Sequence, residues 1–154
     1  MNVKATLSPD DLARACADAM WKDDSASSGL GMTIIDVGAG RATLSMTVQP
    51  HMVNGQRIAH GGFIFTLADS AMAFACNSHN EKAVAAHCDI TFIRPGKLGD
   101  RLTATAREIS RNGRSGIYDV RVTSGDEVIA EFRGHSRTIG GTWLPAAEID
   151  TKKK

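Results

Sequence analysis

The chain has 154 residues, of which 42% are hydrophobic and 23% are charged, and its formal net charge at neutral pH is +1. This size and composition predict one domain with a substantial core and leave no room for a second domain of ordinary size. The near-zero net charge, without a basic run that alternates with aromatic residues, argues against nucleic acid as a partner.

The cysteines and the apolar segments predict where the protein works. Cys16, Cys76 and Cys88 are odd in number and widely spaced, so neither a disulfide framework nor a zinc site is expected. The amino terminus has no apolar core of signal-peptide length, and no segment approaches the roughly 18 unbroken apolar residues of a membrane span. We therefore expect a cytoplasmic protein without a membrane segment, and we assign no role to the terminal "TKKK".

The chain begins with a predicted helix over residues 9–22. Ser8 supplies an N-cap and Pro9 a first-turn proline, and apolar residues follow at helical spacing. The segment "DDSASSGLG" then breaks the pattern. Two strands are predicted next, over 32–37 and 41–49, because apolar and polar residues alternate with period two in the second of them.

The longest apolar stretch runs from Gly61 to about Asn77. It is longer than an ordinary strand and holds few strongly hydrogen-bonding side chains, so we predict a helix that is buried on most of its sides. Asn112-Gly113 is a strong hairpin signal. Four strands separated by recognisable turns are predicted after the helix, over 83–93, 101–109, 116–122 and 127–139.

This order of elements predicts an α+β fold. An apolar helix must be enclosed, and a strongly curved sheet of about six strands is the only other material in the chain. We therefore expect the hotdog architecture, in which an antiparallel sheet wraps a long central helix, with the last four strands in antiparallel succession. One domain is expected over 1–154, with an N-terminal helix and loop over 1–28 and a tail over 143–154.

One acid, Asp69, interrupts the apolar helix. Burying an unpaired carboxylate costs several kcal/mol or raises its pKa until it takes up a proton, so an acid kept there usually has a function. The alternative is a structural carboxylate. In that case Asp69 would be bonded to Ser70 or to a backbone amide, or would cap a break between two short helices.

The entry to this helix, "HMVNGQRIAHGGF", favours the close approach of another molecule. Asn54-Gly55 and Gly61-Gly62 permit unusual backbone angles, and the N–H groups at a helix start suit a carbonyl oxygen that becomes negative during acyl transfer. Gly61 and Asp69 lie eight residues apart, which is about 12 Å along a helix. They can act on one carbonyl only if two such helices lie antiparallel across a two-fold axis, so the geometry requires a dimer.

The segment "NGQRIAHGGFIFTLADSAMAFACNS" resembles the hotdog-fold acyl-CoA thioesterases, and within them the phenylacetate-degradation type called PaaI. The resemblance continues through "DITFIRPGKLGDRLTATA", "GIYDV" and "FRGHSRTIGGT" and covers residues 30–142. It implies hydrolysis of a thioester between coenzyme A and a short aromatic acyl group, phenylacetyl or ring-hydroxylated phenylacetyl. It also implies that no metal or redox cofactor takes part, and that two dimers form a homotetramer.

The resemblance also implies roles for single residues. Asp69 is the catalytic carboxylate, which either attacks the carbonyl or removes a proton from water. Gly61 donates its amide to the thioester oxygen, Asn54 orients the acid or the water, and His60 neighbours the thioester. The dipeptide Ala85-Ala86 departs from the pattern, because some related enzymes place a serine or threonine there, close to the water.

Four residues are expected to bind the substrate. Gly62 follows the amide donor in the chain. Guanidinium groups at turns are suited to the phosphates of coenzyme A, and the arginines that flank turns are Arg94, Arg111 and Arg114.

Two other functions stay open at this point. A hotdog hydratase or dehydratase would act on acyl-CoA or acyl-carrier-protein esters with an acid/base pair that reaches the α and β carbons, and the usual paired motif is not apparent. A non-catalytic acyl-CoA sensor would bind the ester with little hydrolysis. No helix-turn-helix or basic extension precedes the domain, which weakens the sensor hypothesis.

Overall fold

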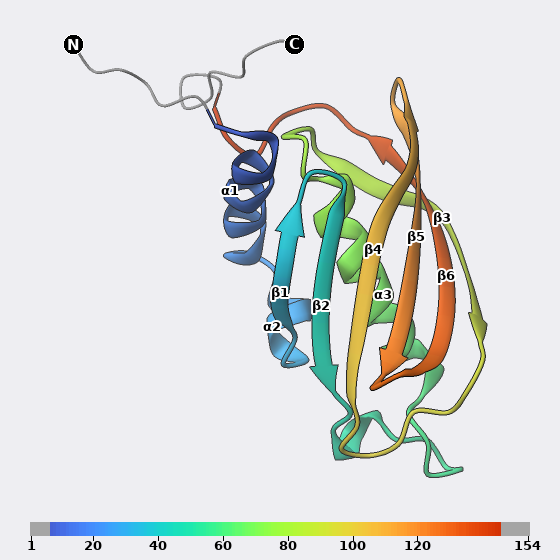
Figure 1. Ribbon diagram of the computed structural model, residues 1–154. Helices are drawn as coiled ribbons and strands as arrows, with labels where there is room; N and C mark the ends of the chain where they lie inside the picture. The colour runs from blue at the N-terminus through green and yellow to red at the C-terminus, as the bar shows by residue number, and fades with distance from the viewer. Residues whose placement is uncertain (1–6, 146–154) are drawn as a thin grey trace.

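The computed structural model describes residues 7–145 (Figure 1), so the expected tail and its "TKKK" fall largely outside the described residues. Helices and strands occur largely where the sequence predicts them. In chain order they are α1 (Pro9–Trp21), α2 (Ser25–Gly29), β1 (Thr33–Gly38), β2 (Arg41–Thr47), a 3-10 turn (Pro50–Met52), α3 (Gly61–Cys76), β3 (Ala83–Phe92), β4 (Arg101–Asn112), β5 (Ser115–Ser124) and β6 (Glu127–Thr138).

The amino-terminal helix forms as its capping residues predict. The hydroxyl of Ser8 accepts a hydrogen bond of 3.1 Å from the N–H of Asp11, and Pro9 occupies the first turn. The segment that breaks the helical pattern contains the short helix α2, which the sequence prediction missed. The carboxylate of Asp24 caps α2 by accepting the N–H of Ser27 at 2.9 Å.

The six strands form one antiparallel sheet in the order β1-β2-β4-β5-β6-β3. The prediction that the last four strands follow one another is wrong for β3, which pairs with β6 and not with β4. The physical reason is that α3 crosses the face of the sheet before β3 begins, so β3 starts at the far edge (Figure 1). The edge of β2 that is left without a partner then pairs with β4.

The central helix α3 lies in the concave side of the curved sheet (Figure 1). Its buried side chains include Leu67, Met72 and Phe74, and it contacts every strand as well as α1 and α2. One side of α3 is less enclosed, because Gly62 is exposed and Asp69 is half-buried. Within the described residues, no helix combines the length and the apolar character needed to cross a bilayer.

Candidate active site at the central helix

Asp69 lies in the middle of α3 without a hydrogen-bonding partner of its own. No residue between 7 and 145 donates a hydrogen bond to its carboxylate, and burial raises the pKa of that carboxyl above its usual range. The hydroxyl of Ser70 is bonded instead to that of Ser27, at 2.8 Å. Since α3 also runs through Asp69 without a break, none of the contacts expected of a structural carboxylate is found among the described residues.

A hollow of about 490 Å³ reaches Asp69, and we call it the Asp69 hollow. It lies between α3, the start of β3 and the segment that follows β6. Most of its wall is apolar. Besides Asp69 itself, the residues that line it include Met72, Asn77, Lys82, Val84, Ile139 and Trp143.

The thiol in the Asp69 hollow is a weaker nucleophile than the carboxylate. Cys76 also lines the hollow, but burial, and to a smaller extent the charge of Asp69, raise the pKa of its thiol to about 12. A neutral thiol is a poor nucleophile. The strand residue Ala85 faces the hollow without a hydroxyl group, as the sequence implies.

At the start of α3, one backbone N–H has no hydrogen-bond acceptor among the described residues. The ring Nδ1 of His60 accepts the N–H of Gly62 at 2.9 Å, and the carbonyl oxygen of His60 accepts the N–H of Phe63 at 3.0 Å. The N–H of Gly61 has no acceptor among the described residues. Because it also lies at the positive end of the helix dipole, it is a ready donor to an oxygen with negative charge.

Local geometry sets the orientation of the His60 ring and favours glycine at position 61. In neutral His60 the proton lies on Nε2, because Nδ1 acts as the acceptor, so the exposed side of the ring offers a donor. A Cβ atom on Gly61 would come 2.8 Å from the ring of Phe92. Any larger residue at position 61 would therefore crowd the space beside the N–H group.

Asn54 holds a tight loop in front of the helix start. Its side-chain oxygen accepts the N–H of Gln56 at 2.9 Å and that of Ile58 at 3.3 Å, and its backbone oxygen accepts the N–H of Arg57 at 2.9 Å. Arg57 has a φ of 64° in this turn. The side-chain NH₂ of Asn54 has no partner among the described residues and remains available as a donor.

A second hollow, of about 470 Å³, lies at this end of α3, and we call it the Gly61 hollow. It brings together three of the predicted site residues, Asn54, Gly61 and Arg94, with Phe92 and Ile93 beside them. The Gly61 hollow shares no lining residue with the Asp69 hollow. Within one chain, the proposed amide donor and the carboxylate therefore face different hollows.

The remaining predicted substrate-binding residues are divided between the two ends of the molecule. The N–H of Gly62 is bonded to His60 and is not available to a ligand. Arg111 and Arg114 lie at the β4–β5 turn, where Arg114 donates to the carbonyl oxygen of Thr138 at 3.0 Å. Arg94 is exposed at the Gly61 hollow, so the structure does not place the three arginines together in one chain.

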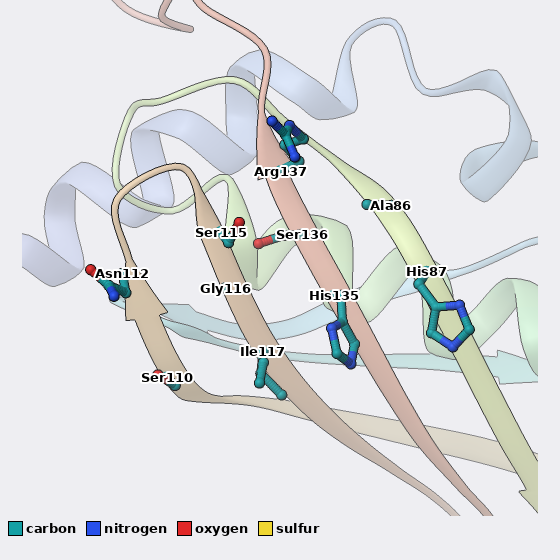
Figure 2. A pocket seen from close by; sticks show the side chains of 10 residues that line it. All are labelled: Ala86, His87, Ser110, Asn112, Ser115, Gly116, Ile117, His135, Ser136 and Arg137. Atoms are coloured by element: carbon teal, nitrogen blue, oxygen red, sulfur yellow. The ribbon is translucent and has the colours of Figure 1, made fainter.

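Another hollow, of about 370 Å³, lies between the turn of β4 and β5 and the strands β6 and β3 (Figure 2). His87 and His135 lie side by side there, with ring centroids 5.5 Å apart. Cys88 and Ile90 pack against the core, so His87 points away from α3. Among residues 7–145 no three histidine, cysteine or acidic side chains are placed to hold a metal ion.

Sequence reasoning missed two side chains of the Asp69 hollow. Lys82 and Trp143 come from segments that carry no motif, and the structure brings them to the C-terminal half of α3. The only signal in the sequence is the Gly140-Gly141 pair, which marks a turn after β6.

Comparison with known proteins identifies the family. A family model described as the thioesterase superfamily matches residues 56–131. The acyl-coenzyme A thioesterase PaaI of Escherichia coli K12 is 45% identical over 127 residues, which are 82% of this chain and 91% of that protein. This chain belongs to the PaaI-type acyl-CoA thioesterases.

Solved structures agree with this membership. The E. coli PaaI structure, from the phenylacetic acid degradation operon, has a TM-score of 0.86 at 43% identity and covers 88% of this chain and 99% of that one. A Streptococcus mutans protein bound to acetyl-CoA has a TM-score of 0.69 at 26% identity, covering 72% and 90%. The hotdog fold is confirmed, and this PaaI-type enzyme is a thioester hydrolase.

Proposed function

We propose that this thioesterase hydrolyses phenylacetyl-CoA or ring-hydroxylated phenylacetyl-CoA to the free acid and coenzyme A, at a site shared by two copies of the chain. The observation that carries the proposal is the separation of the two hollows. Asp69 lies in one, and Gly61, whose N–H has no acceptor among residues 7–145, lies in the other. A second chain is the simplest way to bring them to the same thioester.

The free edge of β3 supports this assembly. Among the described strands β3 pairs only with β6, and apolar side chains near its two ends are exposed, Val84 at 46% and Phe92 at 50%. Exposed apolar edges of this kind usually pair with another strand. Val84 lines the Asp69 hollow and Phe92 lines the Gly61 hollow.

Antiparallel pairing of two β3 strands about their midpoint, near Cys88, places the start of one strand opposite the end of the other. Val84 of one chain then lies near Phe92 of its partner. The Asp69 hollow of one chain is thereby joined to the Gly61 hollow of the other, and two equivalent sites form. We further propose, from the resemblance to PaaI, that two such dimers form a homotetramer in the cytoplasm.

In the proposed mechanism the Gly61 N–H holds the thioester oxygen as it becomes negative, and the dipole of α3 adds to this stabilisation. Ionised Asp69 of the other chain either attacks the carbonyl carbon and expels the coenzyme A thiolate, giving a mixed anhydride that water then hydrolyses, or removes a proton from a water molecule that attacks the carbonyl carbon and displaces the thiolate. The side-chain NH₂ of Asn54 orients the acid or the water. His60 borders the thioester. The leaving thiolate is stable near neutral pH, since an ordinary thiol has a pKa of about 8.5, so no strong general acid is required.

The size and the character of the Asp69 hollow support a short aromatic acyl group. At about 490 Å³ and with mostly apolar walls, it is comparable to the roughly 300–1,000 Å³ of small-molecule sites. The likeness to E. coli PaaI supports the same assignment. We propose that Arg94, Arg111 and Arg114, which lie beside hollows of the surface, supply cations for the phosphates of coenzyme A.

The direct test is Asp69→Asn, assayed by thiol release from phenylacetyl-CoA. The amide keeps the shape but lacks nucleophilic and basic power, so turnover should fall by about 10²–10⁴-fold while the fold is retained. Asp18→Asn is the matched control, because Asp18 is an exposed carboxylate on α1. Near-normal turnover of Asp69→Asn would overturn the catalytic assignment, and an active monomer in light scattering would overturn the shared site.

A further inference from the structure

The segment that follows β6 is held beside the C-terminal half of α3. It turns back toward α1 (Figure 1) through Gly140 and Gly141, whose φ angles of 86° and 90° favour glycine. The side-chain oxygen of Asn80 accepts the N–H groups of Trp143 and Leu144 at 3.0 and 2.9 Å. Its NH₂ group donates to the carbonyl oxygen of Leu144 at 3.2 Å. These three bonds set the position of Trp143.

The orientation of the Trp143 ring is set as well. Its indole N–H donates to the side-chain oxygen of Asn77 at 2.9 Å, and Asn77 is only 2% exposed. The NH₂ group of Asn77 donates hydrogen bonds to the carbonyl oxygens of Ala73 and Ala83. Trp143 is therefore a fixed aromatic wall of the Asp69 hollow, with its polar atom turned to the protein.

Lys82 is the only basic side chain among the residues that line the Asp69 hollow. Its ammonium group lies 4.7 Å from the centre of the Trp143 ring, and no carboxylate of the described residues comes within 4.0 Å of it. Because both polar groups of Asn77 are occupied, the ammonium is the available hydrogen-bond donor in a wall that is apolar apart from Asp69 and Asn77.

We propose that Trp143 and Lys82 form the acyl-binding subsite and select aryl acyl groups that carry an oxygen on the ring. The proposal rests on the proposed function, which puts the thioester at Asp69. The aryl ring packs against Trp143 and Met72, and the ring oxygen accepts a hydrogen bond from Lys82. A flat aromatic wall gives more contact to a ring than to a flexible chain, and a ring hydroxyl in an apolar hollow needs a partner.

The role of Trp143 is tested by the ratio of kcat/KM for phenylacetyl-CoA to that for hexanoyl-CoA. Trp143→Ala should lower this ratio by about tenfold, the worth of a good aromatic contact, whereas Trp143→Phe should keep most of it. Trp21→Phe is the matched control, because the ring of Trp21 packs on Phe74 at 6.2 Å and does not line the hollow. An unchanged ratio in Trp143→Ala would overturn the role of this residue.

The role of Lys82 is tested by the ratio of kcat/KM for 4-hydroxyphenylacetyl-CoA to that for phenylacetyl-CoA. Lys82→Met should lower this ratio by about tenfold, the worth of a hydrogen bond to a charged donor, and Lys82→Arg should restore part of it. The exposed Lys22, which caps α1, provides the control Lys22→Met. If Lys82 instead binds coenzyme A phosphates, KM rises equally for both esters, and the proposal is overturned.

A binding measurement separates this proposal from the catalytic one. The chain has two tryptophans, so Trp21→Phe leaves Trp143 as the only one. Titration of this variant with 4-hydroxyphenylacetate should quench its fluorescence, and hexanoate at the same concentration should not. Equal responses to the two acids would overturn the subsite. If Asp69→Asn were fully active but the quenching were selective, only the catalytic assignment would fail.

Discussion

A site shared between two chains predicts that two inactive variants can restore each other. Asp69→Asn removes the carboxylate from the middle of α3. Gly61→Pro removes the N–H from the start of α3, at the first helical position, where proline is well accepted. His60 has φ −64° and ψ 132°, which is the conformation that a following proline requires. Each variant should therefore fold and lose activity for a defined chemical reason.

The size of the recovery follows from the symmetry. Loss of one donor to the oxygen costs about 10²–10³-fold in kcat, and loss of the carboxylate about 10²–10⁴-fold, so neither homodimer contributes appreciably. In a random equal mixture, half of the dimers are mixed. Each mixed dimer has one site with both lesions and one intact site, so about a quarter of the wild-type activity should return.

The assay is thiol release from phenylacetyl-CoA after the two variants are unfolded together and refolded, or are expressed together with different tags. Gly61→Ala is the companion variant, because it keeps the N–H and reports only the crowding against Phe92. Copurification through both tags establishes that mixed dimers are present. Mixed dimers with no more activity than the average of the two parents would refute the shared site.

Two further predictions concern pH and stability. Burial raises the pKa of Asp69. In the proposed mechanism the ionised form is the active one, so activity should be lost as the pH falls through that raised pKa; a kcat/KM profile with its acid limb at the pKa of an ordinary aspartate would contradict this. Glu108→Ala leaves the buried hydroxyl of Tyr118 without its acceptor at 2.8 Å. The free energy of unfolding should fall by about 2 kcal/mol, which lowers Tm by about 4–8 °C in thermal denaturation. Adding Tyr118→Phe to the Glu108→Ala variant should recover part of this loss, because it removes the hydroxyl that lacks an acceptor. No recovery would point to a different cause.

Local elements could be predicted from the sequence, because short-range chemistry decides them. The central helix is predicted from Gly61 to about Asn77 and occupies Gly61–Cys76, and the Asn112-Gly113 hairpin forms with a φ of 58° at the glycine. The place of β3 beside β6 could not be predicted. It depends on where α3 leaves the sheet, which no local pattern encodes.

The same distinction applies to the candidate site. Asp69 and Gly61 stand out because a carboxylate in an apolar helix and a glycine pair at a helix start are both visible in the sequence, and their eight-residue spacing already suggests two chains. Lys82 and Trp143 do not stand out. Trp143 is held by hydrogen bonds that it donates to asparagines 63 to 66 residues earlier in the chain, and contacts of that range follow only from the complete fold.

In the proposed mechanism, the histidine cap of α3 also limits which acyl compounds the enzyme can cleave. Because His60 takes the second N–H of the helix for itself, the helix start offers one backbone donor to the developing negative charge and not two. A single donor is enough when a thiolate departs, since sulfur carries the charge easily. An amide or an alkyl ester, with a far poorer leaving group, needs more assistance than this helix start provides. Discrimination against the ordinary ester and peptide bonds of the cell is thus an expected by-product of the way the helix begins.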